Sequence, residues 1–137
     1  MLGIRNFLIK LLLMKAKPKI LILDDNKLFC ALLDSLIGQV FLLNFANSEF
    51  ELCQLTRTEN YNLVILRICE SILKSRRLIN HIRESQKNKD VPVIAIISRI
   101  RSKTLKRIIE LGIYDVLIKP FNVQSFMNKI DLVLNYK

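Results

Sequence analysis

Five polar or charged residues lie at the ends of short apolar runs, where they could together form a reactive crevice. They are Asp24 and Asp25 after the first run, Arg67 at the end of a later one, Ser98 after the next, and Lys119 after the last. Paired carboxylates can hold a divalent cation, while a hydroxyl and an ammonium group can donate hydrogen bonds. A guanidinium has no nucleophilic oxygen, stays protonated, and can only donate hydrogen bonds. The set therefore combines groups that bind ions with one group that cannot act as a nucleophile.

The elements that must position these residues alternate along the chain. Continuous apolar runs predict strands that are buried on both faces, at residues 19–23, 40–45, 63–66, 93–97 and 116–118. Helical spacing of apolar residues predicts helices at 26–39, 48–57, 72–88, 102–111 and 123–135. Alternation of this kind predicts an α/β fold with a parallel sheet, right-handed crossovers and helices on both faces. In such sheets function gathers at the C-terminal ends of the strands, where all five residues are expected.

Local signals support several of these boundaries. Ser48 and Glu51 form a capping box at the start of one helix. Asp25 or Asn26 is a candidate cap for the first helix after the first strand. Gly112 is expected in the left-handed conformation that ends the helix before it.

Four segments in order resemble the receiver domain of two-component response regulators, of the single-domain chemotaxis-regulator type. They are residues 20–25, 61–66, 92–98 and 112–121, and the resemblance covers 18–137. It implies a doubly wound, flavodoxin-like five-stranded parallel sheet with strand order 2-1-3-4-5. We therefore expect a receiver-like domain at 18–137, preceded by an apolar and basic extension at 1–17.

The resemblance also implies roles for the site residues. In the family an aspartate accepts the phosphoryl group where Arg67 stands here. Asp24 and Asp25 would be the metal carboxylates, with the carbonyl of Cys69 as a further ligand. Ser98 would be the switch hydroxyl. Lys119 would bind the phosphoryl group, next to a cis bond to Pro120.

Three positions depart from the family pattern. Arg67 replaces the acceptor, Val116 replaces the aromatic switch residue, and residues 68–72 lack the usual Pro-Gly turn. The sequence therefore predicts a degenerate site in a non-enzymatic pseudo-receiver of a two-component pathway. Phosphorylation at a displaced residue (Cys69, Glu70 or Ser71) is the alternative that retains phosphoryl chemistry.

A charge count predicts that no cofactor binds this site. Asp24 and Asp25 facing Arg67 and Lys119 give a net charge of zero, and Arg67 could donate two bonds to one carboxylate. A dication there would meet a positive charge at a cost of about 4 kcal/mol per unit charge. Mg²⁺ binding is therefore expected to be weak or absent, which leaves Asp24 and Asp25 as a vestigial metal pair.

The net charge of +10 and the pI of about 9.8 fit two interpretations equally: an anionic partner, or surfaces that are basic only because the proteome is rich in Lys and Arg. The predicted partner-binding residues lie on and before one short helix that contains no acid until its end: Arg99, Arg101, Lys103, Lys106 and Arg107. We expect a protein partner with an acidic surface to dock on this helix and on the helix at 72–88. Binding to a nucleic acid backbone is the alternative, although 7% aromatic residues and no Trp argue against base stacking.

The remaining features set limits on the protein's class. Cys30, Cys53 and Cys69 show no metal or disulfide spacing and suit a reducing cytosol. His81 is the only histidine, so no serine or cysteine triad can form. Residues 1–14 are apolar but too short to span a bilayer. They are an amphipathic helix packed on the domain or a partner, a surface membrane anchor, or an extension upstream of a start at Met14. The sequence leaves open the partner, the pathway, the oligomeric state and whether the conformation is active-like.

Overall fold

The structure is a computed structural model that describes residues 5–6, 9, 13, 17–68, 71–98 and 102–135. Its strands are β1 (Lys19–Leu23), β2 (Leu42–Ala46), β3 (Leu63–Ile68), β4 (Val93–Ile97) and β5 (Asp115–Ile118). Its helices are α2 (Lys27–Ile37), α3 (Glu49–Thr58), α4 (Ile72–Glu84), α5 (Ser102–Ile109) and α6 (Val123–Asn135). The strands are parallel and lie in the order β2-β1-β3-β4-β5, as predicted.

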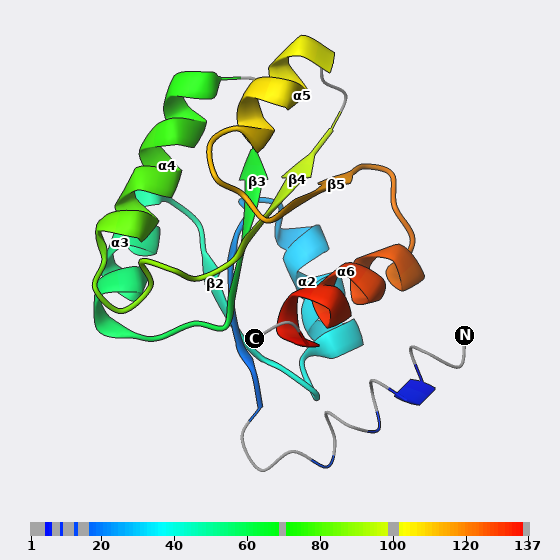
Figure 1. The fold of residues 1–137 in the computed structure, drawn as a ribbon. Coiled ribbons are helices and arrows are strands. Elements are labelled where there is room, and N and C mark those ends of the chain that lie inside the picture. Colours follow the sequence, from blue (N-terminus) through cyan, green and yellow to red (C-terminus); the bar gives the residue numbers. More distant parts are fainter. Residues whose placement is uncertain are drawn as a thin grey trace.

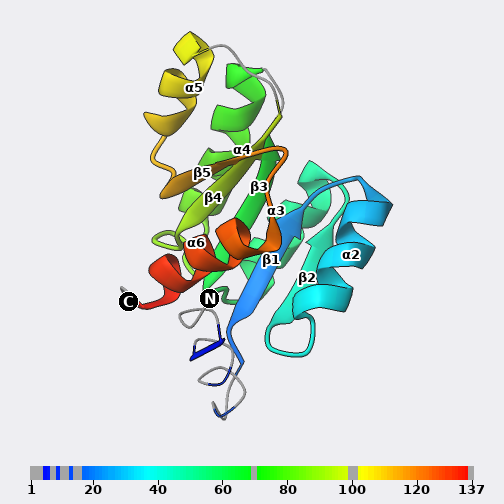
Figure 2. The same cartoon turned by 90° about the vertical axis from the view of Figure 1, so that its right-hand side faces the viewer.

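Helices cover both faces of the sheet (Figures 1 and 2). Helices α2 and α6 pack on one face, where the core includes Ile22, Ile65 and Phe126. Helices α3, α4 and α5 pack on the other face, where Leu66 and Leu78 are buried. Alternate strand residues point to opposite faces, and both faces are buried, so each central strand is apolar throughout.

The helix caps agree with the local signals. The side chains of Asn26, Ser48 and Ser71 each accept a hydrogen bond from a backbone N–H in the first turn of α2, α3 and α4 respectively. Gly112 has φ of 91°, which is the left-handed conformation predicted after α5. The peptide bond between Lys119 and Pro120 is cis, as the family resemblance implied.

Two predicted boundaries were wrong because polar contacts end or delay the element. Strand β2 begins at Leu42 rather than at residue 40, since the N–H groups of Val40 and Phe41 donate to the carbonyl of Ile37 in a turn. Helix α4 ends at Glu84 rather than at residue 88, because Asn88 turns inward to bond the backbone of the segment after α3.

Strand β3 extends past its predicted end at residue 66 to Ile68, so Arg67 lies inside the strand and pairs with Ile96 of β4. Helix α5 ends at Ile109, short of the predicted residue 111. Among the described residues, no helix is both long and apolar enough to cross a membrane.

Candidate functional site

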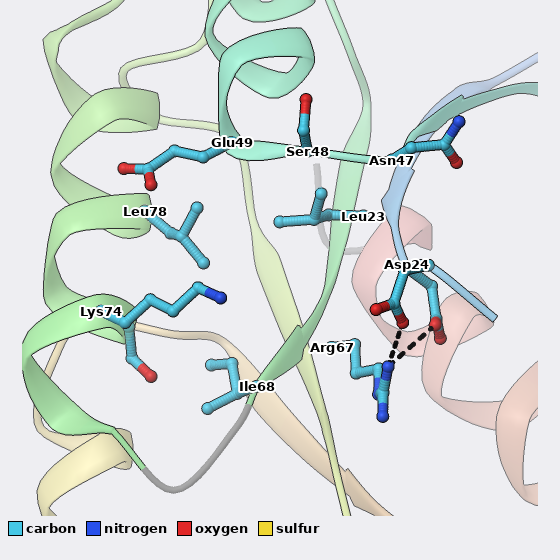
Figure 3. Close-up of a pocket in the computed structure, with 11 residues that line it drawn as sticks. Leu23, Asp24, Asn47, Ser48, Glu49, Arg67, Ile68, Lys74 and Leu78 are labelled. Atoms are coloured by element: carbon cyan, nitrogen blue, oxygen red, sulfur yellow. Dashed lines mark hydrogen bonds and ion pairs between the residues drawn. The ribbon is translucent and has the colours of Figure 1, made fainter.

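Arg67 bridges the two aspartates that follow β1 (Figure 3). Its Nη1 atom donates a hydrogen bond to Asp25 Oδ1 and lies 3.7 Å from Asp24 Oδ1. The contact differs from the predicted bidentate pair, because one nitrogen reaches both carboxylates. Strand pairing explains the meeting, since β1 and β3 are neighbours and Leu23 is in register with Leu66.

The two aspartates have different surroundings. The side chain of Asp24 is 1% exposed, whereas that of Asp25 is 73% exposed. Asp24 Oδ1 also accepts a hydrogen bond of 2.9 Å from the N–H of Asn26, while Asp24 Oδ2 is buried with no hydrogen-bond partner among the described residues. A buried carboxylate without compensating partners is costly. The guanidinium of Arg67 is therefore the charge that most directly stabilises ionised Asp24.

The crevice around this ion pair is small, with a volume of about 100 Å³. Its polar lining includes residues that were not singled out for the site, from the loop before α3 and from the first turns of α3 and α4: Asn47, Ser48, Glu49, Lys74 and Ser75. The side chain of Lys74 extends from α4 toward the crevice (Figure 3). Its position beside the site follows from the packing of α4 on the sheet.

Glu49, which lines the crevice, contacts two side chains of α4. Its carboxylate accepts hydrogen bonds of 2.6 and 3.0 Å from Arg77 and lies 3.0 Å from His81 Nε2. The hydrogen bonds from Arg77 hold the pKa of Glu49 below its ordinary value. His81 thus helps to join α3 to α4.

The described lining of the acidic crevice does not include Ser98 or Lys119. Both line an apolar groove of about 730 Å³ between α2 and the start of α6. Ile97, the last residue of β4, is buried beneath α4 and α5, and Ser98 follows it on the other side of the chain. Lys119 Nζ lies 4.4 Å from the ring centroid of Phe29, a cation–π contact.

Lys119 forms no ion pair with Asp24 or Asp25, and its ammonium group lies over Phe29. The three directly paired side chains, Asp24, Asp25 and Arg67, sum to −1. Lys119 stays close enough for its charge to act on Cys30 together with those of Asp24 and Asp25. No group of three or more His, Cys, Asp or Glu side chains suited to a metal occurs in the part of the chain that the structure describes. Cys69, the predicted carbonyl ligand, and Glu70 lie outside the described residues.

The basic residues of α4 and α5 fall into two groups. Arg77 pairs with Glu49, and Arg83 donates to the carbonyls of Val91 and Gly112, so both are engaged within the domain. The exposed cations of α5 have no ion pair with any described acid, and they form what we call the α5 basic surface: Lys103, Lys106 and Arg107. Arg99 and Arg101, predicted to belong to the same surface, lie outside the described residues.

Comparison with known proteins agrees with this architecture. The response regulator receiver domain family matches residues 20–131. The chain belongs to the response regulator receiver family. It is therefore the receiver domain of a two-component-type regulator, a class that acts through contacts with other proteins.

Two red-algal relatives are similar to this receiver in sequence. The probable transcriptional regulator ycf29 of Porphyra purpurea is 27% identical over 80% of this chain, and that of Pyropia yezoensis is 25% identical over 81%. The matched region is 53% of the first relative and 50% of the second. The receiver thus spans about half the length of the curated relatives it matches.

Solved structures show the same fold. A response regulator from Thermotoga maritima has a TM-score of 0.75 at 22% identity, covering 88% of this chain and 99% of that one. The non-phosphorylated HemR receiver domain from Leptospira biflexa has a TM-score of 0.69 at 26% identity, covering 86% and 94%. The receiver domain of the sensor kinase PA1611 from Pseudomonas aeruginosa, with magnesium coordinated in its active site cleft, has a TM-score of 0.75 at 16% identity, covering 88% and 99%.

Proposed function

We propose that this receiver signals without phosphorylation and acts as a protein-interaction module rather than as an enzyme. The observation that carries the proposal is the bridge from Arg67 to both Asp24 and Asp25. The family resemblance places the acceptor carboxylate where Arg67 stands, and a guanidinium offers no oxygen to phosphorylate. The ion pair also occupies the carboxylates that a phosphoryl-transfer site would use for its metal.

The crevice does not suit Mg²⁺. A magnesium site needs oxygen ligands in near-octahedral geometry, but here both carboxylates contact a cation that is part of the chain. A dication would have to displace Arg67 or accept its repulsion. The structure supports no role for Asp24 and Asp25 beyond holding Arg67 and, through Asp24, the N–H of Asn26 at the start of α2.

Phosphorylation at a displaced residue has little support from Ser71. Its hydroxyl accepts a hydrogen bond of 3.2 Å from the N–H of Lys74 and caps α4. Its backbone carbonyl accepts a further bond from Ser75 Oγ, which ties it to the same turn. A phosphoryl group on Ser71 would have to form at a residue engaged in the helix cap.

Incubation with acetyl phosphate and Mg²⁺, followed by intact-mass measurement, tests the proposal. We expect no added phosphoryl group on this protein, while a control receiver with an aspartate acceptor gains one. A stable gain mapped by peptide analysis to residues 67–71 would refute the pseudo-receiver and support the displaced-acceptor alternative.

The proposed partner is a protein with an acidic surface, and the α5 basic surface is the proposed contact. The support is local: Lys103, Lys106 and Arg107 are exposed cations on adjacent turns, and α5 lies beside α4, which carries exposed Lys74 and Arg76 (Figure 1). On a merely solvated face, acids would be expected to alternate with bases.

A further inference from the structure

The groove between α2 and α6 is walled by large apolar side chains that solvent can reach. Leu28, Leu32 and Leu36 are 80%, 54% and 48% exposed, and we call them the α2 stripe. They recur every four residues, so they share one face of α2. Phe29 and Phe121 line the groove beside them. Contiguous apolar surface of this kind marks a contact site.

In the sequence of residues 1–14, which precede β1, apolar residues recur at helical spacing. At 3.6 residues per turn, one half of the helical wheel is wholly apolar and consists of Ile4, Phe7, Leu8, Leu11, Leu12 and Met14, together with Met1. The polar residues Arg5, Asn6 and Lys10 fall on the other half, with Ile9 and Leu13. The sequence of this segment therefore predicts an apolar helix face that could match the apolar groove.

Four residues of this segment are described. Arg5, Asn6, Ile9 and Leu13 are helical and exposed, and Leu13 is 79% exposed. All four belong to the half of the wheel that carries the polar residues. The exposed apolar residues Ile9 and Leu13 are therefore suitable positions for a control variant.

The point of attachment brings the segment to the groove. Pro18 is buried at the start of β1, and its carbonyl accepts a hydrogen bond of 2.9 Å from the N–H of Leu42. Leu42 follows the turn that ends α2, so Pro18 lies near the C-terminal end of that helix. A 14-residue helix is about 21 Å long, which exceeds the roughly 12 Å from Leu28 to Leu36 along α2. The three residues 15–17 provide the connection.

We propose that the apolar half of residues 1–14 docks in cis on the α2 stripe and covers the groove. Leu8 and Leu11 are the central contacts on the segment, and Leu32 is the central contact on α2. The segment then shields the apolar surface of its own domain and leaves the α5 basic surface, on the opposite face of the sheet, free for a partner.

Methyl NMR on the full chain tests this contact directly. With leucine methyl groups labelled, we expect NOE cross-peaks from Leu8 and Leu11 to Leu28, Leu32 and Leu36. The double variant Leu8→Asp/Leu11→Asp should lose these cross-peaks and expose the groove. The matched double variant Ile9→Asp/Leu13→Asp, which changes the exposed half, should retain them.

Other occupants give different results. Cross-peaks that appear only between chains, in an isotope-filtered mixture of labelled and unlabelled protein, would assign the groove to a second copy and overturn the proposal. Absence of these cross-peaks in the full chain would also overturn the proposal. If the protein then bound vesicles of neutral and anionic phospholipid, residues 1–14 would be assigned to a membrane surface instead. Amide spectra confirm that each variant is folded. Phosphodonor resistance does not depend on this contact, so failure here leaves the proposed function standing.

Discussion

At the scale of single residues, the chemistry of the crevice depends on whether position 67 carries a cation or an anion. Arg67 bridges Asp24 and Asp25, so the three side chains sum to −1. A phosphoryl-transfer site requires a metal in contact with carboxylates, and the guanidinium is in contact with them instead. The charge at this position should therefore decide whether the crevice takes a divalent cation.

Replacing Arg67 by Asp should create a Mg²⁺ site. The change converts a net charge of −1 into −3, and one unit charge at 4 Å is worth about 4 kcal/mol at an effective dielectric of 20. Since 1.4 kcal/mol is a factor of ten, affinity should rise by more than about tenfold. Isothermal titration of both proteins with MgCl₂ measures the change.

Arg67→Lys is the matched control, because it keeps the positive charge and should keep Mg²⁺ binding weak. Tight Mg²⁺ binding by the unmodified protein, equal to that of Arg67→Asp, would contradict the role given to Arg67.

Sequence reasoning predicted the meeting of Arg67 with Asp24 and Asp25 because neighbouring parallel strands bring their ends together. It did not place the ammonium group of Lys119, although strand register puts Arg67, Ser98 and Lys119 on the same side of the sheet, two residues beyond Ile65, Ile96 and Leu117. The flexible stem of Lys119 also found an aromatic face, that of Phe29, which no strand-end argument could locate. Lys74 was missed as a site residue because its place depends on how α4 packs.

At the scale of elements, polar contacts between helices and loops fix the end of the sheet opposite the crevice, where the chain enters β3 and β4. Asn88 is 1% exposed. Its side chain donates to the carbonyls of Thr56 and Glu59 at 2.7 and 2.8 Å and accepts from the N–H of Tyr61 at 2.9 Å. One side chain thus connects the loop after α4 to the segment between α3 and β3.

Replacing Asn88 by Ala should destabilise the domain by about 3 kcal/mol. The carbonyl of Glu59 and the N–H of Tyr61 would lose this partner, and each unsatisfied buried group costs about 1–3 kcal/mol. The carbonyl of Thr56 keeps the hydroxyl of Ser85. Urea unfolding measures the change, with exposed Lys87→Ala as the control. A loss below about 1 kcal/mol would show that the loop relaxes to satisfy these groups.

The contact between Glu49 of α3 and Arg77 of α4 should make the free energy of unfolding depend on pH in the acid range. The hydrogen bonds from Arg77 lower the pKa of Glu49 in the folded state. The stabilisation of the fold by ionised Glu49 is therefore fully present above the pKa of Glu49 in the unfolded chain, and it is lost as the pH falls through the pKa in the folded state. Glu49→Gln should therefore be less stable than the parent at pH 7, with a difference that shrinks below about pH 4. Urea midpoints at pH 7 and pH 3 test this.

Glu110→Gln is the control for that series, because Glu110 is an exposed carboxylate without an ion pair to any described residue. It should shift both midpoints little. A Glu49→Gln difference that stayed constant from pH 7 to pH 3 would mean that the contact acts through packing rather than through charge.

Element order followed from the sequence because continuous apolar runs and helical periodicity are strong local signals, whereas the strand order was implied by the family resemblance. The ends of β2 and α4 were missed for a physical reason. Apolar Val40 and Phe41 fit a strand pattern, yet a turn onto Ile37 takes their N–H groups. The helical periodicity of α4 continues past Glu84, but the side chain of Asn88 donates hydrogen bonds to the backbone carbonyls of Thr56 and Glu59, which are distant in the sequence. Tertiary hydrogen bonds of this kind have no signature within a local window.

At the scale of the whole molecule, which has a net charge of +10, the basic residues differ in whether the fold uses them. On α4, Arg77 and Arg83 are engaged within the fold, whereas Lys103, Lys106 and Arg107 are exposed on α5. Exposed charge that the fold does not use is available for steering a partner of opposite charge. This exposed charge is the basis on which we propose docking as the step that carries the signal.

Partner binding should therefore be sensitive to salt and to the α5 basic surface. The triple variant Lys103→Ser/Lys106→Ser/Arg107→Ser should bind a captured acidic protein partner at least about tenfold more weakly at low salt, because several rim charges together accelerate association. The difference should shrink near 0.5 M salt as the Debye length shortens. The control variant Lys17→Ser/Lys27→Ser/Arg57→Ser removes the same charge from exposed positions elsewhere. Surface plasmon resonance across a salt series distinguishes the two. Equal losses of affinity in both variants would mean that net charge alone, and not the α5 basic surface, determines binding. Tighter binding to duplex DNA than to the protein partner would mean that the α5 basic surface binds a nucleic acid backbone.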